Sequence, residues 1–133
     1  MTASLDVCIR GAGIVGRTLA LMLARQHLRV GLVRAPAPPA GPDVRAYALN
    51  HAARQLLQSV RCWPDARGAA TVHGMRIWGD EGGSVSFAAP TPAGTDAETA
   101  LTWIVDVPEL EAQLDQALSF APQVHWLDAP EDA

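Results

Sequence analysis

Residues 8–20 read CIRGAGIVGRTLA, in which an apolar run leads into glycines and then into a helical pattern. Gly11, Gly13 and Gly16 have the G-x-G-x-x-G spacing. Between a strand and a helix, the first glycine permits a tight turn, the second lets the backbone approach a pyrophosphate, and the third allows close helix–strand packing. Free N–H groups at the helix N-terminus attract the anion. The stretch predicts a nucleotide-binding turn, the alternative being a turn that holds no ligand; the turn comprises Gly11, Ala12, Gly13, Ile14, Val15 and Gly16.

The sequence on both sides of this turn has the pattern of a βαβ unit. Residues 5–10 (LDVCIR) are apolar and rich in strand formers, as in a parallel strand buried on both faces. An almost wholly apolar helix is predicted from the turn to about His27, and residues 29–34 (RVGLVR) form a second buried strand. A proline-rich loop follows, and a second helix is predicted from Arg45 to about Val60.

The rest of the chain contains strands and one more helix. Residues 72–89 alternate apolar and polar side chains on either side of GDEGG, which predicts a β-hairpin and the beginning of a second sheet. Residues 101–105 are a short strand, and Asp106 is placed to cap the next helix, with Glu109 at the spacing of a capping box. The predicted buried face of that helix consists of Leu110, Leu114 and Leu118. Residues 123–129 form a last strand.

The composition excludes several classes of function. Ten basic and fourteen acidic residues give a net charge of −4. This balance lacks the excess of positive charge that is typical of nucleic-acid-binding proteins. No apolar run approaches the roughly 20 residues of a membrane span, and no leader pattern begins the chain, so we expect a cytoplasmic protein. Cys8 and Cys62 form neither a disulfide framework nor a metal-binding pair, and we expect both to be buried thiols. The four histidines also lack ligand spacing, so no metal site is predicted.

Five stretches together resemble a known family of flavoenzymes. They are residues 6–34, 43–57 (DVRAYALNHAARQLL), 62–65 (CWPD), 75–89 (MRIWGDEGGSVSFAA) and 103–114 (WIVDVPELEAQL). Their order and spacing resemble those of FAD-dependent aromatic hydroxylases, and most closely the branch that hydroxylates the ring in ubiquinone biosynthesis. Asp43-x-Arg45 followed by A-x-A-L, and later M-R-I-W, is more specific than the glycine motif.

The resemblance implies an α/β fold with a Rossmann-like FAD/NAD(P)-binding half domain of parallel strands. The hairpin then begins a substrate-domain sheet. The implied boundaries are 1–70 for the βαβ unit and following helix, 71–100 for the hairpin of a truncated substrate domain, and 101–133 for the return to the nucleotide-binding domain. FAD is the implied cofactor, with NAD(P)H as reductant. Catalysis belongs to the flavin, so no catalytic side chain is assigned.

Two arginines matter for the implied FAD site. Arg45 matches a family arginine near the FAD pyrophosphate and ribose; its alternative is a solvated residue in a first helical turn. Arg34 stands where the second strand normally ends in a ribose-binding glutamate, and Arg10 is expected close to it. The pair could hold the 2′-phosphate of NADP, flank a weakened FAD site, or mark a chain that no longer binds nucleotide. One lost charge-assisted hydrogen bond costs roughly 1.5–3 kcal/mol, which would weaken binding without abolishing it. We favour weakened FAD binding, because Asp43-x-Arg45 belongs to the flavin pattern.

Two further departures from the family bear on function. Val107, Pro108 and Glu111 replace polar or basic residues expected near the flavin, although they also suit a helix cap and surface. Family members run to several hundred residues, and their second flavin motif lies beyond this chain. We therefore expect an N-terminal FAD-binding portion that is inactive alone, its apolar hairpin covered by a missing C-terminal portion or by homo-oligomerisation. The alternatives are a non-catalytic truncated paralogue that binds a protein partner and, third, a stand-alone NADP-binding module.

Overall fold

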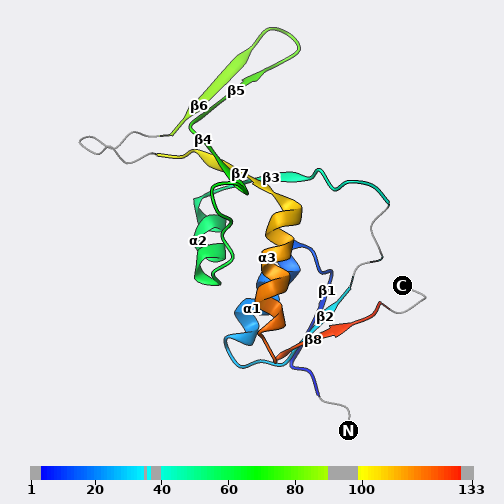
Figure 1. Cartoon of the computed structure of the whole chain (residues 1–133). Coiled ribbons are helices and arrows are strands. Elements are labelled where there is room, and N and C mark those ends of the chain that lie inside the picture. The colour runs from blue at the N-terminus through cyan, green and yellow to red at the C-terminus, as the bar shows by residue number, and fades with distance from the viewer. Residues whose placement is uncertain (1–3, 35, 37–39, 90–98, 130–133) are drawn as a thin grey trace.

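The computed structural model describes residues 4–34, 36, 40–89 and 99–129. The elements in chain order (Figure 1) are β1 (Val7–Arg10), α1 (Ile14–Ala24), β2 (Val30–Val33), β3 (Ala46–Leu49), α2 (His51–Ser59), β4 (Ala69–Val72), β5 (Gly74–Trp78), β6 (Ser84–Ala88), β7 (Thr102–Asp106), α3 (Val107–Ser119) and β8 (Val124–Leu127). They form a parallel sheet, an antiparallel sheet and a separate hairpin. The predicted α/β class is confirmed.

The parallel sheet has the strand order β1-β2-β8, so the predicted βαβ unit is confirmed and the last strand completes it. All four residues of β2 are buried. Helix α1 packs on one face of this strand. On the other face a Cβ at Gly31 would lie 2.7 Å from Cδ1 of Leu5 and 2.8 Å from Cδ1 of Leu127. Glycine thus allows two leucines to close over the middle of the sheet.

Two details of this unit differ from expectation. Cys8 is exposed rather than buried, because β1 is an edge strand of the sheet and its residues alternate between half-buried and exposed. Helix α1 ends at Ala24, three residues before the expected end at His27. His27 has a φ of +61°, a left-handed conformation that turns the chain out of the helix toward β2.

The antiparallel sheet, of order β3-β7-β4, corrects the second predicted helix. Ala46–Leu49 is a strand paired with β7, and the helix begins only at His51. Asn50 is its N-cap, with the side-chain oxygen accepting a hydrogen bond from the amide of Ala53 at 2.9 Å. Strand β4, which the sequence reading did not predict, pairs with the other side of β7. Pairing with β7 therefore overrides the helical pattern of residues 45–50.

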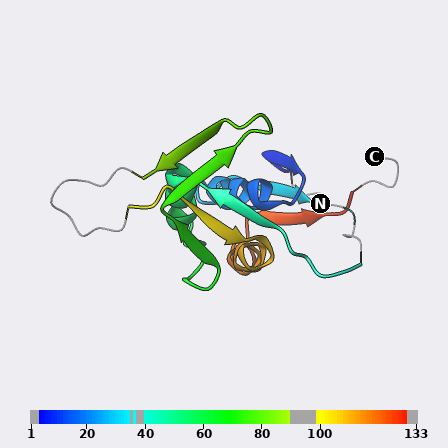
Figure 2. The same cartoon turned by 90° about the horizontal axis from the view of Figure 1, so that it is seen from above.

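Helix α3 joins the two layers through a buried stripe. The three leucines predicted for its inner face are fully or almost fully buried, namely Leu110, Leu114 and Leu118. They pack in one core with residues of α1 and β2, and Figures 1 and 2 show α3 alongside α1. Asp106 caps the helix by accepting from the amide of Glu109 at 3.0 Å. The backbone N–H of Asp106 donates to Gly68 at 2.9 Å instead of to Glu109, so only half of the predicted capping box forms.

The predicted hairpin is present as β5 and β6, which project from the body of the molecule (Figure 1). Met75 lies opposite Phe87 and Ile77 opposite Val85, so these four apolar side chains share one face. Every residue of both strands is exposed.

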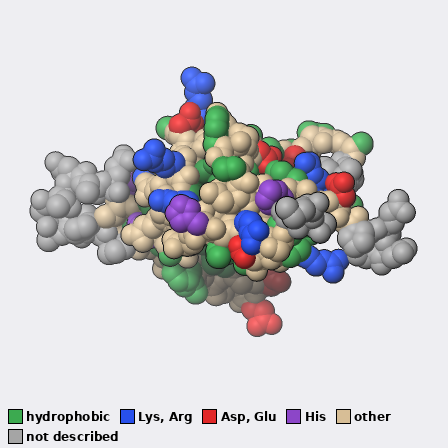
Figure 3. Space-filling view, turned by 90° about the horizontal axis from the view of Figure 1, so that it is seen from below, with side chains coloured by type: hydrophobic (Ala, Val, Ile, Leu, Met, Phe, Trp, Pro, Cys, Tyr) green, Lys and Arg blue, Asp and Glu red, His purple; other side chains and the backbone are tan. Residues whose placement is uncertain are grey.

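The surface of the described residues mixes charges. On the face shown in Figure 3, arginines lie among acidic, histidine and apolar side chains. No helix in the described part of the chain is long and apolar enough to cross a membrane.

Candidate functional site

The turn between β1 and α1 has a backbone that explains two of its three glycines. Gly11 has a φ of +106°, which other residues rarely adopt. A Cβ at Gly16 would lie 1.9 Å from the carbonyl oxygen of Gly11, so α1 packs too closely on the turn for any side chain. At Gly13 a Cβ would meet no atom within 4 Å. The first and third glycines therefore serve the turn, whereas the second leaves open space in front of it.

The N-terminus of α1 borders a cleft of about 940 Å³, to whose lining Ala12 and Gly13 belong. Gly13 is the N-cap and offers no side-chain capping bond, and the first turn of the helix holds no acidic residue. Ile14 packs partly buried against the core, whereas the side chain of Val15 is 81% exposed. The amides of an uncapped helix start are donors without helical partners, and the helix dipole makes this end favourable to an anion.

Arg17 occupies the wall of the cleft between α1 and α3. Its guanidinium donates to the carbonyl oxygen of Ala12. Its Nε lies 2.8 Å from Oδ1 of Asp115, and its Nη1 lies 3.5 Å from Oε1 of Glu111. The Arg17 side chain is only 15% exposed. This arginine thus ties the turn to α3.

Arg45 also lines the cleft, in the segment that leads into β3 rather than in a helical turn. It forms a two-pronged ion pair with Asp43, with Nε–Oδ1 at 2.9 Å and Nη2–Oδ2 at 2.7 Å. The side-chain hydrogen bonds from Arg45 lower the pKa of Asp43 to about 2, and the same pair raises the pKa of Arg45. Nη2 of Arg45 also lies 3.3 Å from Oε1 of Glu111. Glu111, predicted to be unfavourable near an anion, holds both Arg45 and Arg17.

Arg34 lines the same cleft, and its guanidinium lies against an aromatic ring. Its backbone N–H donates to Leu127 at 2.9 Å, and its guanidinium carbon lies 4.6 Å from the ring centroid of Trp126 on β8. Arg10 ends β1 and pairs in register with Val33, the residue before Arg34. The structure therefore directs Arg34 onto an indole face, a favourable cation–π arrangement, and Arg10 is not among the residues that line the cleft.

The cleft balances its charges internally. Its lining includes three arginines and three carboxylates, namely Arg17, Arg34, Arg45, Asp43, Glu111 and Asp115. The volume is within the range of small-molecule and cofactor sites. Such a site can hold an anion at the start of α1, with arginine donors close by. The anion must compete with Glu111 for Arg17 and Arg45, and also with Asp115 for Arg17 and with Asp43 for Arg45.

Three residues of this site were missed from the sequence. Arg17 directly follows the glycine motif, and Asp115 lies one helical turn after Glu111, so both carried a readable spacing signal. Trp126 reaches Arg34 only because β8 pairs with β2. No local sequence pattern predicts the pairing of β8 with β2.

The described residues hold no group of three or more histidine, cysteine or acidic side chains that could bind a metal ion. The Cys62 thiol is buried, and burial raises its pKa. Cys62 therefore stays a protonated thiol at neutral pH, as a packing residue does.

Comparisons with known proteins relate this geometry to flavoenzymes. No protein-family model matches the chain. The chain is similar to the probable FAD-dependent monooxygenase PqsL from Pseudomonas aeruginosa, with a TM-score of 0.67 and 23% identity. It is similar to p-nitrophenol 4-monooxygenase PnpA from Pseudomonas putida DLL-E4, with a TM-score of 0.66 and 18% identity. It is also similar to the flavin-dependent monooxygenase PieE, solved with FAD and substrate, with a TM-score of 0.59 and 19% identity.

These similarities cover nearly all of this chain but a minor part of the others. They span 93%, 96% and 93% of this chain, and 32%, 32% and 23% of the PqsL, PnpA and PieE chains. The chain thus spans a third or less of the length of these structures. At these identities the likeness establishes the fold, which is that of one part of the flavin-dependent monooxygenases.

Proposed function

We propose that the chain is the N-terminal FAD-binding portion of a flavin-dependent monooxygenase that hydroxylates an aromatic ring, of the type that acts in ubiquinone biosynthesis. The observation that carries the proposal is the open space at Gly13, at the uncapped start of α1 and on the wall of an arginine-bearing cleft. The likeness to three flavin-dependent monooxygenases supports the flavin-dependent monooxygenase part of the proposal, and the ubiquinone type rests on the sequence resemblance. Because the chain matches a third or less of those structures, it is assigned the FAD-binding role and not the whole reaction.

The residues of the turn fit the pyrophosphate of a dinucleotide. Backbone N–H groups of the first turn of α1 would donate to the phosphates, and the missing side chain at Gly13 lets them approach. Arg45, which also lines the cleft, supplies a planar guanidinium suited to a phosphate. When bound, FAD supplies the oxygen chemistry after reduction by NAD(P)H.

The part of the site at Arg34, where a ribose would lie, is expected to lower the affinity for FAD. A carboxylate at the end of the second strand would accept hydrogen bonds from a ribose, and Arg34 cannot accept them. The loss corresponds to roughly one to two decades of affinity. Glu111 adds a negative charge beside Arg45 and Arg17. We therefore propose weakened FAD binding, and NADPH is to be titrated in parallel because Arg34 suits a 2′-phosphate.

The substitution Gly13→Asp tests the proposal. Residue 13 has an extended backbone with φ −78°, and no atom lies within 4 Å of its added Cβ, so aspartate fits without strain. Aspartate is also a favoured N-cap, so thermal stability is expected to stay the same or rise. Its carboxylate would occupy the space of the pyrophosphate and repel it. Calorimetric titration with FAD should detect binding to the wild-type chain and none to the variant.

The control is Gly83→Asp, which adds the same charge at another open glycine, in the hairpin turn. It should bind FAD like the wild type. Equal FAD affinity of Gly13→Asp and the wild type would refute the site. Binding of neither FAD nor NADPH to the wild-type chain would refute the cofactor assignment.

The second candidate function, a non-catalytic protein that binds a partner, is favoured by the exposed hairpin. Its apolar face leaves 40–55% of each side chain accessible, those side chains being Met75, Ile77, Val85 and Phe87. Contiguous exposed apolar side chains mark an interaction surface. Sedimentation of the wild type and of an Ile77→Lys/Val85→Lys variant tests this candidate. Because the FAD-binding portion is also expected to cover its hairpin by homo-oligomerisation, this candidate is supported only if the variant loses self-association and the wild type binds neither FAD nor NADPH. A wild type that stays monomeric at high concentration contradicts the homo-oligomer.

A further inference from the structure

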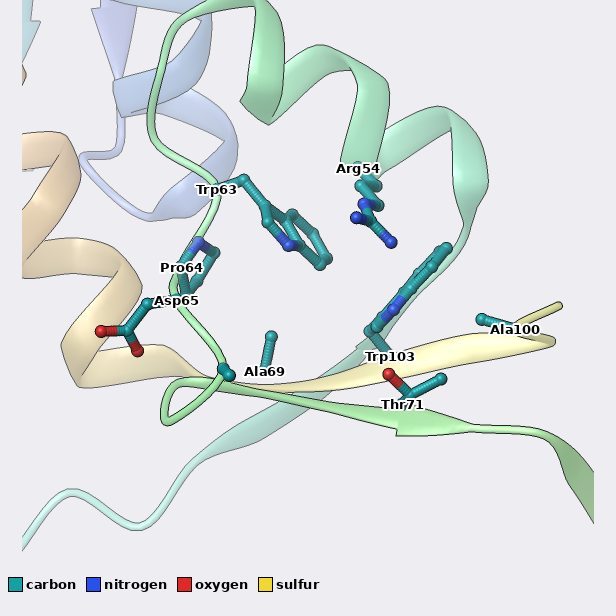
Figure 4. A pocket seen from close by; sticks show the side chains of 9 residues that line it. Arg54, Trp63, Pro64, Asp65, Ala69, Thr71, Ala100 and Trp103 are labelled. Carbon is teal, nitrogen blue, oxygen red and sulfur yellow. The ribbon is translucent and has the colours of Figure 1, made fainter. Parts of the chain in front are cut away.

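A second pocket, of about 440 Å³, lies between α2 and the antiparallel sheet (Figure 4). It shares no lining residue with the cleft at the glycine turn. Two of its lining residues are tryptophans. Trp63 and Trp103 meet edge to face, with ring centroids 5.6 Å apart and planes at 82°, and Trp103 is 5% exposed. The pocket thus contains an aromatic pair that the flavin assignment does not use.

The charged group of this pocket is Arg54. Its guanidinium carbon lies 4.5 Å from the ring centroid of Trp103 and 5.3 Å from that of Trp63. Figure 4 shows the guanidinium extending from α2 between the two indoles, toward the open space. The indole faces attract the guanidinium by cation–π interaction. Indole has no hydrogen-bond acceptor, so the N–H groups of Arg54 gain no hydrogen bond from the two rings.

Arg54 is unusual among the ten arginines, all of which are described. Only Arg17 and Arg54 are half-buried, and the other eight are exposed. Arg17 satisfies its guanidinium with a carbonyl and two carboxylates. The Arg54 side chain donates no hydrogen bond to any residue that the structure describes and forms no ion pair with one. A half-buried cation with its donors directed into a cavity indicates that an anion belongs there.

The acid of the pocket does not neutralise this charge. In Figure 4 the carboxylate of Asp65 points away from Arg54. Its Oδ1 already accepts from the amide of Arg67 at 2.9 Å and from that of Gly68 at 3.4 Å, so it serves a local turn. The Thr71 side chain points into the pocket from β4 and offers a hydroxyl.

We propose that this pocket binds a small aromatic monocarboxylate. The carboxylate would pair with the guanidinium fork of Arg54, an arrangement that carboxylate geometry matches with two parallel hydrogen bonds. The ring would lie against Trp63, Pro64 and Ala69, where apolar and aromatic surface lines the wall. The proposal does not depend on FAD binding, because the two sites share no residue.

The test is calorimetric titration of the full chain with three probes. Phenylacetate carries both the ring and the charge, phenylacetamide keeps the shape without the charge, and acetate keeps the charge without the ring. We expect phenylacetate to bind one molecule per chain, at least about tenfold more tightly than either analogue. No saturable binding of phenylacetate, or equal affinity for either analogue, would overturn the proposal.

Two variants locate the site. Arg54→Gln removes the anion partner, and Ala69→Leu fills the pocket while Arg54 stays in place. Each should weaken phenylacetate binding at least about tenfold. Arg76→Gln is the matched control, because that guanidinium also lies over an indole, 5.8 Å from the centroid of Trp78, but on the exposed hairpin. Wild-type affinity in Ala69→Leu would overturn the location even if Arg54→Gln proved unstable by circular dichroism.

Discussion

Replacing Gly16 by alanine tests how closely α1 packs on the glycine turn. The added Cβ would lie 1.9 Å from the carbonyl oxygen and 3.1 Å from the carbonyl carbon of Gly11, and 3.5 Å from Cγ2 of Ile9. The two shortest contacts are with backbone, which cannot rotate away as a side chain can. To reach an ordinary C···O distance of about 3.3 Å, the helix must shift by roughly 1.4 Å from the turn.

The expected cost follows from two opposing effects. Overpacking of this kind costs about 1–3 kcal/mol, and the upper part of that range applies because backbone must move. Alanine returns about 1 kcal/mol through its higher helix propensity than glycine. The net loss is about 1–2 kcal/mol, which lowers the Tm of a chain of this size by roughly 4–10 °C. The shifted helix start would also lower FAD affinity, since its amides leave their positions.

The control for this experiment is Gly13→Ala, the same substitution three residues earlier. There a Cβ meets no atom within 4 Å, so only a small loss of N-cap preference is expected. Thermal and urea unfolding of both variants give the comparison. Equal stability of Gly16→Ala and the wild type, or equal loss in both variants, would show that the helix does not pack on the turn as described.

Three further predictions concern the cleft and the core. Glu111→Gln should tighten FAD binding several-fold in calorimetry, because it frees Arg17 and Arg45 from a competing carboxylate; unchanged or weaker affinity would contradict this. Leu114→Ala should destabilise the chain by about 2–5 kcal/mol in urea unfolding, since the side chain is fully buried, and a loss below about 1 kcal/mol would contradict the packing. Asp43 has a folded pKa of about 2 against 3.8, so its ion pair stabilises the fold above pH 3.8 and is lost as the pH falls through 2. Wild type should therefore exceed Asp43→Asn in Tm at neutral pH, and the difference should shrink as the pH falls through 2, whereas a pH-independent difference would exclude the ion pair as the cause.

Local patterns predicted the parts of the fold that local physics decides. The glycine spacing indicated the strand–turn–helix unit because Gly11 and Gly16 are fixed by contacts within six residues of sequence. Asp106 was recognised as a cap for the same reason, since its partner is the amide three residues later. Leu110 and Leu114 followed from helical periodicity.

The features that local sequence patterns did not predict depend on pairing between strands that are distant in the chain. Residues 46–49 have a helical pattern yet pair with β7, more than fifty residues later in the chain. The exposure of Cys8 depends on β1 being an edge strand, and strand order leaves no local mark.

In the candidate site, too, local motifs could be predicted from the sequence, whereas contacts between distant elements could not. The glycine turn and Arg45 were identified from motif and resemblance, and both line or border the same cleft. The partners of Arg45 and Arg34 were not foreseen, because Glu111 and Trp126 arrive from α3 and β8. A sequence shows which charges exist, but only the packing of distant elements shows which of them neutralise one another.

The central position of β2 also governs how the molecule forms. Val30 pairs with Val7, a near neighbour along the chain, and with Val124, which is separated from it by most of the sequence. Closing so long a loop is entropically costly and slow, so the β1–β2 pair is expected to form well before β8 joins. During synthesis the face of β2 at Gly31 therefore stays uncovered by Leu127 until β8 has been made. Until β8 pairs, one edge of β2 stays unpaired, and an unpaired strand edge is prone to aggregation.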